Sequence, residues 1–305
     1  MFHALIDIGS NTVRLALYQI TDGRAEMVLK KKNALGLAAL IDNDRVSEVG
    51  ANMLLDILQD YRRFLDSFFI TRVDGFATAA LRSAENGRDI VRRIREEVGF
   101  DIRILTGEEE ATYDFIGATH GQESHDGVLI DVGGASTEVI VFYDNVIAHK
   151  VSLPMGSLSL HRMYCRDILP TTAEIGEIIR EAKDIVEHEP ALAFLHSEEI
   201  TGIGGTMKGA AALYSQLYGK PEENVSGGVP MKVKRLPDMI TRYLKDRVQG
   251  EEDLAKYFRA AADRLHTLLP GLAIVESITE HFGAETLVYS DSGVREGFIH
   301  GEILK

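Results

Sequence analysis

The sequence has few of the residues that build disulfide-bonded, metal-cluster or membrane proteins. Its 305 residues include a single cysteine, Cys165, which excludes an intrachain disulfide and a cysteine metal cluster. We expect a structural role for Cys165, because nothing in the sequence marks it as a nucleophile. No apolar run approaches the roughly 20 residues that span a bilayer, and no charged region followed by an apolar signal segment opens the chain. We therefore expect a soluble, cytoplasmic protein that binds no membrane.

Positive charge is also scarce. The chain has 33 lysines and arginines against 47 aspartates and glutamates, which gives a net charge of −14. Broad binding of nucleic acid needs an extended basic surface, so this class of partner is not expected. The visible basic clusters, at residues 30–32, 62–63 and 92–95, are typical of solvated strand edges and helix faces. A small polyanion can still bind where basic groups and Mg²⁺ are concentrated locally. The histidines, including His120 and His125, lack zinc-ligand spacing.

One strand-turn-strand motif occurs twice, at residues 4–12 and 128–138. In each copy an apolar strand ends in an aspartate, Asp7 or Asp131, and a turn of glycine and hydroxyl residues leads into a second apolar strand. A hairpin signal, Asp-Gly or Asp-Asn, then leads to a third strand. This order excludes a P-loop and a dinucleotide fingerprint, in which the glycine turn opens a helix. Two such loops facing each other would bind phosphate from both sides.

The residue types in the two loops suit phosphate and a hard cation. Glycines let backbone N–H groups approach an anion, and hydroxyl and amide side chains add neutral donors. Asp7, Asp131 and Glu138 carry the carboxylates that hold Mg²⁺, or Mn²⁺ in its place, directly or through water. The expected phosphate ligands in the loops are Ser10, Asn11, Thr12, Gly133, Gly134, Ala135, Ser136 and Thr137.

Hydrophobic periodicity and capping signals predict the same order of elements in both halves. In the first half we expect helices over 47–68, 89–98 and 106–118 and strands over 4–8, 13–20, 25–31, 73–78 and 102–105. In the second half we expect strands over 128–132, 136–143, 146–153, 199–203 and 286–289 and helices over 171–186, 207–217, 236–248, 251–269, 271–282 and from 293 onward. The pattern predicts an α/β protein of two duplicated ribonuclease-H-like βββαβαβα domains with a cleft between them.

We place the first domain at residues 1–122 and the second, with extra helices, at 123–292. The last helix, over 293–305, is expected to rejoin the first domain. The segment His120–Asp126 is the expected linker. A duplicated unit of this kind resembles the superfamily of actin, sugar kinases and heat-shock-chaperone ATPases, although the fold alone does not define the chemistry.

Four segments together resemble the exopolyphosphatase and guanosine pentaphosphate phosphatase family within that superfamily. They are residues 7–14 (DIGSNTVR), 77–82 (ATAALR), 106–111 (TGEEEA) and 131–138 (DVGGASTE). Residues 154–156, 204–208, 269–273 and 292–297 continue the resemblance. Ala135 stands where the family often has a third glycine. Longer members carry additional C-terminal helical domains, so we expect any polyphosphate channel built from them to be shortened or absent unless another subunit supplies it.

The resemblance implies roles for further residues. Glu110, in the first turn of a helix, is the expected general base for the attacking water, since neighbouring anions would raise its pKa. Arg14 and Arg82 are the expected phosphate ligands, because the guanidinium fork matches two phosphate oxygens. Gly205, Thr206 and Lys208 complete the expected substrate contacts. Glu108 and Glu109 are expected only to complement the helix dipole.

These features predict a Mg²⁺-dependent hydrolase that releases the terminal phosphate of inorganic polyphosphate by in-line attack of water. Hydrolysis of the 5′ terminal phosphate of guanosine pentaphosphate is the alternative with the same chemistry. An ATP-dependent kinase or chaperone-like ATPase of the same superfamily stays open, because residues 204–206 lie where those proteins contact adenosine. A non-catalytic phosphate sensor is a further alternative. The resemblance also implies a homodimer.

Overall fold

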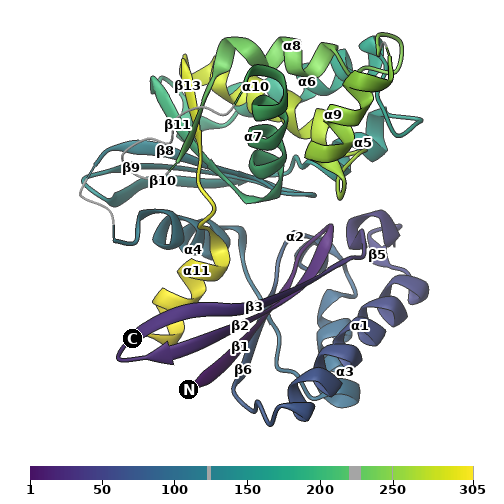
Figure 1. The fold of residues 1–305 in the computed structure, drawn as a ribbon, viewed down its shortest axis with the longest axis vertical. Coiled ribbons are helices and arrows are strands. Elements are labelled where there is room, and N and C mark those ends of the chain that lie inside the picture. Colours follow the sequence, from purple (N-terminus) through teal and green to yellow (C-terminus); the bar gives the residue numbers. More distant parts are fainter. Residues whose placement is uncertain (122–124, 220–227, 249, 305) are drawn as a thin grey trace. The chain divides into compact units, whose positions relative to one another are not determined.

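The computed structural model describes the chain except for residues 122–124, 220–227, 249 and 305. Its contacts divide the chain into two compact units, Met1–Glu110 with Phe298–Lys305, and Ala111–Gly297 (Figure 1). Part of the expected linker over 120–126 lies outside the described residues. No helix in the described part is long and apolar enough to cross a bilayer.

The first unit is built on a mixed five-stranded sheet with the order β3-β2-β1-β6-β7. Its strands are β1 (Phe2–Ile8), β2 (Thr12–Thr21), β3 (Arg24–Ala34), β6 (Val73–Ala77) and β7 (Arg103–Ile104). β1 pairs antiparallel with β2 and parallel with β6, and its interior is fully buried, as expected for a central strand. Asp22 and Gly23 both have positive φ angles, 50° and 73°, as a two-residue hairpin turn requires.

The helices of the first unit cover the sheet through apolar stripes. They are α1 (Glu48–Ser67), α2 (Ala79–Ser83) and α3 (Gly87–Val98), and α1 and α3 pack together beside the strands (Figure 1). Tyr61 of α1 donates its hydroxyl to the Val13 carbonyl at 3.0 Å, which fixes the helix on β2. The short helix α2 and a small hairpin, β4 (Ile41–Asp42) and β5 (Arg45–Val46), were not among the expected elements.

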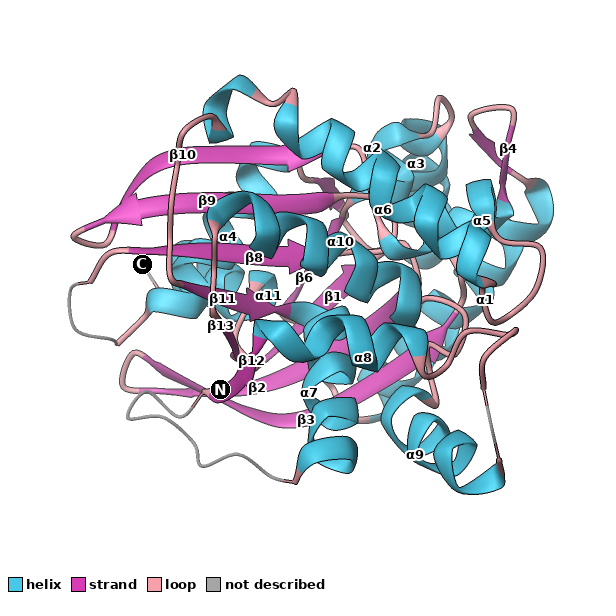
Figure 2. Cartoon of the chain, turned by 90° about the horizontal axis from the view of Figure 1, so that it is seen from above, coloured by secondary structure: helices cyan, strands magenta, loops and turns pink. Residues whose placement is uncertain are grey.

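The second unit contains a six-stranded mixed sheet with the order β10-β9-β8-β11-β13-β12. Its strands are β8 (Gly127–Val132), β9 (Thr137–Tyr143), β10 (Val146–Leu153), β11 (Glu199–Ile203), β12 (Val229–Lys232) and β13 (Thr286–Tyr289). Figure 2 shows β8, β9 and β10 side by side. The turn between β9 and β10 again has two positive φ angles, at Asp144 and Asn145. The meander that opens each sheet therefore repeats, which confirms the predicted duplication.

Helices pack on this second sheet around one large apolar cluster. They are α5 (Ser157–Tyr164), α6 (Thr172–Glu187), α7 (Gly204–Tyr218), α8 (Leu236–Thr241), α9 (Glu251–Ala261) and α10 (Leu268–Phe282). The predicted helix over 236–248 was too long, since it ends at Thr241. The predicted helix over 251–269 was wrong as a single element, because α9 ends at Ala261 and α10 begins at Leu268. α5 and the edge strand β12, with Pro230 in its short run, were missed.

One helix follows the edge strand β7 of the first sheet, and another follows β13 of the second sheet, which lies between β11 and β12. α4 (Gly107–Thr119) follows β7, and α11 (Val294–Phe298), continued by a π-helical turn over Ile299–Ile303, follows β13. The predicted capping box of α4 is confirmed: Thr106 N–H donates to Glu109 at 2.8 Å, and Glu109 N–H donates to the Thr106 hydroxyl at 3.1 Å. A Cβ on Gly297 would lie 1.7 Å from the Tyr113 carbonyl oxygen, so only glycine fits between α11 and α4.

Candidate active site

The first loop joins β1 to β2 and carries a buried ion pair. Gly9 N–H donates to the Thr12 carbonyl at 2.9 Å, which closes the turn. Asp7 lies directly opposite Arg14 in the β1–β2 register, and the Arg14 guanidinium donates to its carboxylate at 2.8 Å. Asp7 is only 2% exposed, whereas Arg14 is partly exposed. The turn therefore presents a guanidinium with further N–H donors that a phosphate can use.

The second loop joins β8 to β9 and carries two carboxylates at the equivalent positions. Gly133 N–H donates to the Ser136 carbonyl at 3.0 Å. Asp131 lies directly opposite Glu138 in the register, so the two side chains share one face of the sheet. Glu138 is buried and accepts the hydroxyl hydrogens of Ser136 at 2.8 Å and Ser152 at 2.7 Å. This loop therefore holds negative charge in a fixed geometry.

Both loops are supported by the backbone that follows the third strand. Ala38 N–H, in a 3-10 turn over Leu37–Leu40, donates to the Ser10 carbonyl at 2.9 Å. Leu158 and Ser159, at the start of α5, donate their N–H groups to the Gly134 carbonyl at 2.9 Å. In both loops, a carbonyl of the turn accepts hydrogen bonds from the backbone segment that follows the third strand. The loops are thus held by their own unit rather than exposed as free turns.

Glu110 lies in the first turn of α4 and belongs to the first unit. It is 8% exposed and accepts hydrogen bonds from Arg82 of α2 at 2.6 Å and from the Thr78 hydroxyl. Burial raises the pKa of Glu110 above its usual range; Arg82 and Thr78 oppose this shift, and the charge of Asp7 adds to it. A buried carboxylate with a raised pKa, held by a guanidinium, has the properties of a general base.

The start of α7 lies beside the second loop. Gly204 has a φ angle of +77°, and a Cβ there would lie 2.1 Å from a carboxylate oxygen of Asp131. A Cβ on Gly205 would lie 2.5 Å from the guanidinium of Arg264. Lys208, one turn along the helix, is largely exposed and contacts Asp291 at 3.3 Å. The helix begins at Gly204, three residues before the predicted start, so the predicted contacts at 205–208 all lie in its first turns.

Several predicted ligands have their hydroxyl groups engaged by backbone carbonyls. The Thr137 hydroxyl donates to Met155 at 2.6 Å, and the Thr206 hydroxyl donates to Val132 at 2.7 Å. Both residues are buried. These threonines hold the second loop in place, and a phosphate would meet their backbone rather than their hydroxyls. Asn11, Gly133, Gly134 and Ala135 are more open, whereas Ser10, Thr12 and Ser136 are buried.

The sequence analysis assigned no role to three neighbours of these groups, although Thr78 lies in the segment 77–82 that it quoted. Thr78 and Ser152 donate to the two buried glutamates, and Arg264 lies against Gly205. Strand register could have indicated Ser152, because it lies opposite Glu138 in the β9–β10 pairing. Arg264 carried no local signal, since it lies in the irregular segment between α9 and α10.

The donor set of the second loop fits a hard divalent cation. Asp131 and Glu138 supply oxygen ligands of the kind that Mg²⁺ prefers. The absent side chain at Gly204 leaves room beside the Asp131 carboxylate that any Cβ would fill. Among the described residues, no group of three His, Cys, Asp or Glu gathers in one place. Two protein carboxylates with the remaining positions left to water and substrate phosphate agree with how Mg²⁺ usually binds.

Comparison with known proteins gives related sequences along the whole chain. Exopolyphosphatase 1 of Mycobacterium tuberculosis is 25% identical over 304 residues, which covers 97% of this chain and 86% of that protein. The guanosine-5′-triphosphate,3′-diphosphate pyrophosphatase of Aeromonas hydrophila is 27% identical over 303 residues, covering 98% of this chain. This chain spans 59% of the length of the Aeromonas protein.

The fold and the family model agree with these relatives. The crystal structure of the Aquifex aeolicus member of the Ppx/GppA protein family matches 100% of this chain and 98% of that chain, with a TM-score of 0.76 and 27% sequence identity. The model of the Ppx/GppA phosphatase family matches residues 16–305. Because this match covers nearly the whole sequence, the chain belongs to the Ppx/GppA phosphatase family.

Proposed function

We propose that the chain is a Mg²⁺-dependent exopolyphosphatase that releases the terminal phosphate of inorganic polyphosphate. The observation that carries the proposal is Glu110, a buried carboxylate held by Arg82 at 2.6 Å with its pKa raised by burial. In a family of phosphatases, such a group is suited to orient a water molecule and accept its proton. The named exopolyphosphatase among the relatives supports this substrate class.

In this proposal the two loops bind consecutive phosphates. Arg14 and Arg82 donate to the phosphate oxygens with the guanidinium N–H groups that their carboxylate partners leave available. Backbone N–H groups of residues 9–12 and 133–137 add neutral donors, and Gly205, Thr206 and Lys208 contact the chain beyond the terminal phosphate. These groups offset the charge that develops on the equatorial oxygens during in-line displacement.

Asp131 and Glu138 would hold Mg²⁺, or Mn²⁺ in its place, and Asp7 would reach it through water. The ion supplies charge neutralisation to the phosphates when it is bound. Ser136 and Ser152 keep the Glu138 carboxylate in place through their hydroxyl groups. This support orients the ligand before the ion arrives, which favours binding.

The second candidate is hydrolysis of the 5′ terminal phosphate of guanosine pentaphosphate. The identity to the Aeromonas pyrophosphatase, 27%, is as high as that to the exopolyphosphatase, so the relatives favour neither substrate. Both reactions use the same attacking water and leave a phosphate anhydride one unit shorter. They differ only in the part of the substrate beyond the reacting phosphates, which is a phosphate chain in one case and a guanosine in the other.

The test measures phosphate release with Mg²⁺ from long polyphosphate, tripolyphosphate, guanosine pentaphosphate and ATP, compared by kcat/KM. We expect the highest value for polyphosphate. A higher value for guanosine pentaphosphate would establish the second candidate instead. Transfer to an acceptor without free phosphate would indicate a kinase, and no turnover of any of the four would overturn the hydrolase. Light scattering of the same preparation tests the expected homodimer.

A further inference from the structure

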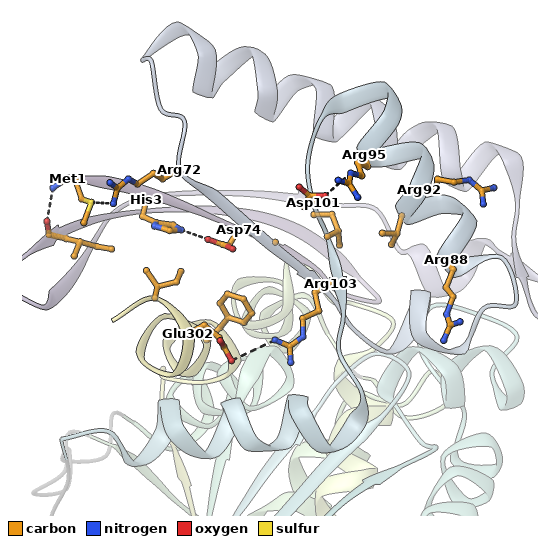
Figure 3. Close-up of a pocket in the computed structure, with 16 residues that line it drawn as sticks. Met1, His3, Arg72, Asp74, Arg88, Arg92, Arg95, Asp101, Arg103 and Glu302 are labelled. Carbon is orange, nitrogen blue, oxygen red and sulfur yellow. Dashed lines mark hydrogen bonds and ion pairs between the residues drawn. The ribbon is translucent and has the colours of Figure 1, made fainter. Parts of the chain in front are cut away.

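A basic pocket lies in the first unit, away from the loop at Asp7. Its volume is about 770 Å³, and it is lined by residues of β1, β6, β7, α3 and the C-terminal segment (Figure 3). His3 lines it near the start of β1, whereas Asp7 is near the end of that strand. Four residues of extended strand separate them by about 13 Å. The pocket is therefore a feature separate from the candidate active site.

The lining is rich in arginine, which is unexpected in a chain with a net charge of −14. Five arginines line the pocket: Arg72, Arg88, Arg92, Arg95 and Arg103. Three of them come from α3 at positions i, i+4 and i+7, so they lie along one side of the helix (Figure 3). Figure 3 shows their guanidinium groups spread along the helix, with that of Arg95 against Asp101.

The carboxylates in the lining are each already matched by a basic group. Asp74 bonds to His3 at 2.7 Å, Asp101 bonds to Arg95 at 3.1 Å, and Glu302 lies 3.8 Å from Arg103. Asp101 and Glu302 therefore offset two of the five guanidinium groups. Arg92 pairs with Asp89 at 2.9 Å, and Arg103 also pairs with Glu109, so two of the five arginines remain without an ion pair among the described residues.

The two arginines for which the described residues provide no ion pair are Arg72 and Arg88. Arg72 contacts the sulfur of Met1 and no carboxylate among the described residues, and Arg88 has no ion pair within the described part of the chain. Both residues are exposed at the pocket, so a ligand can reach them without breaking an existing pair. An arginine without a carboxylate partner is available to bind an anion bidentately.

We infer that this pocket binds an inorganic oligophosphate at a second, non-hydrolytic site. Guanidinium groups bind phosphate oxygens bidentately. The pocket volume lies in the usual range for small-molecule binding sites. The two lining residues with aromatic rings, Phe298 and His3, are 5% and 9% exposed, so the pocket offers no open ring on which a nucleobase could stack. The choice of an inorganic chain as occupant rests on the proposed function. The bound segment is either the distal part of a long substrate or a separate short chain.

The first experiment measures binding of tripolyphosphate to the full-length chain by calorimetry, with EDTA present so that the probe is not consumed. The test variant is Arg72→Ala/Arg88→Ala. The control is Arg63→Ala, an exposed arginine of α1 outside the pocket that pairs with Asp60. We expect the double variant to raise the Kd of the pocket at least tenfold, and the control to stay within twofold. Added salt should weaken binding to the wild type, because the contacts are ionic.

Hydrogen exchange locates the bound chain independently of these substitutions. Tripolyphosphate should slow exchange in α3 and β7 of the wild type and not of the double variant. An unchanged Kd in the double variant, or protection confined to the loops at residues 9–12 and 133–137, would overturn the inference. Neither measurement needs turnover, so both can succeed even where no substrate is hydrolysed and the proposed function fails.

Steady-state kinetics then separate the two sources of the oligophosphate. If the pocket holds the distal part of the substrate, the double variant should raise KM for long polyphosphate at least threefold, with kcat and the KM for tripolyphosphate unchanged. If the occupant is a separate short chain, KM for long polyphosphate stays unchanged, and added tripolyphosphate alters turnover of the wild type but not of the double variant. Each pattern assigns a source to the site that the binding data define.

Discussion

The two loops have the same backbone hydrogen bonds but different charged side chains. In each, a glycine N–H donates to a carbonyl three residues later, and the residue after the glycine accepts N–H groups from the segment that follows the third strand. The register pairs Asp7 with Arg14 in the first loop and Asp131 with Glu138 in the second. The duplicated frame therefore carries an ion pair in one unit and two carboxylates in the other, and the proposed function assigns phosphate binding to the first loop and metal binding to the second.

The helices α4 and α11, which follow β7 and β13, also differ in the acidic residue that they carry. Glu109 caps the start of α4, and Glu296 caps the start of α11 by accepting from Gly293 N–H at 3.2 Å. The residue after the cap is Glu110 in the first unit and Gly297 in the second. The cap is common to both helices, whereas the buried glutamate after it occurs only in the first. The comparison predicts that proton transfer depends on one unit alone.

The largest expected effect is that of Glu110→Gln. We expect kcat to fall by on the order of 10²- to 10⁴-fold, because the amide cannot accept a proton from water. The Mg²⁺ concentration at half-maximal activity should not change, and circular dichroism should report the native fold. Glu108→Gln, a residue of the same helix, is the matched control and should stay near wild type. Near-normal turnover of Glu110→Gln would rule out its role as the base.

Glu138→Gln tests the second loop, which carries the carboxylates of Asp131 and Glu138. The amide oxygen can still accept from Ser136 and Ser152, so the loop should keep its shape while it loses one charge. We expect the Mg²⁺ concentration at half-maximal activity to rise about 100-fold. Ser152→Ala, which removes a support of the carboxylate but no ligand, should give a smaller rise of about tenfold. An unchanged Mg²⁺ requirement in Glu138→Gln would contradict the assignment of metal binding to the second loop.

The sequence predicted the frame of this site better than its side-chain contacts. The Asp-Gly and Asp-Asn turns and the capping box at Thr106 depend on neighbouring residues, so local pattern was enough to find them. The Asp131–Glu138 pairing also follows from the strand register. By contrast, Thr137 and Thr206 looked like phosphate ligands, yet their hydroxyls donate to carbonyls far along the chain. Contacts of that kind depend on packing that no local pattern records.

The misplaced helices have the same physical origin. The apolar spacing over 251–269 is continuous, but the chain leaves the helix after Ala261 and starts α10 at Leu268. α10 is buried on nearly all sides, so its position is set by the large apolar cluster rather than by its own periodicity. Arg264, which reaches Gly205 from this break, could not be found without the tertiary fold.

Arg14→Lys tests the first loop while it keeps a positive charge at residue 14. The lysine can still pair with the buried Asp7, but it lacks the fork that binds a carboxylate and a phosphate together. We expect KM for the phosphate substrate to rise about tenfold, which corresponds to the loss of one charge-assisted contact. The Mg²⁺ requirement should be unchanged. A changed Mg²⁺ requirement with an unchanged KM would instead assign metal binding to the first loop, contrary to the proposal.

Gly156→Ala tests the support behind the second loop. A Cβ at this position would lie 2.3 Å from the Ala135 nitrogen and 2.5 Å from the Gly134 carbonyl oxygen, so the backbone must shift. We expect a loss of about 1–3 kcal/mol in the free energy of unfolding, measured with urea. Gly176→Ala is the control, because a Cβ on this helical glycine would meet no atom within 4 Å and should increase stability slightly. Equal effects in the two variants would show that α5 does not support the loop.

The smallest expected effect is that of Ala135→Gly, which places a third glycine in the second loop. Ala135 is not among the residues with a positive φ angle, so the turn does not need glycine there. We expect the substitution to cost at most about 1 kcal/mol, through the greater freedom of the unfolded chain. The value of kcat/KM should stay within twofold, because the backbone donors are the same. A gain in kcat/KM beyond that range would mean that the Ala135 methyl group restricts the approach of phosphate, and the two loops would then differ in access as well as in charge.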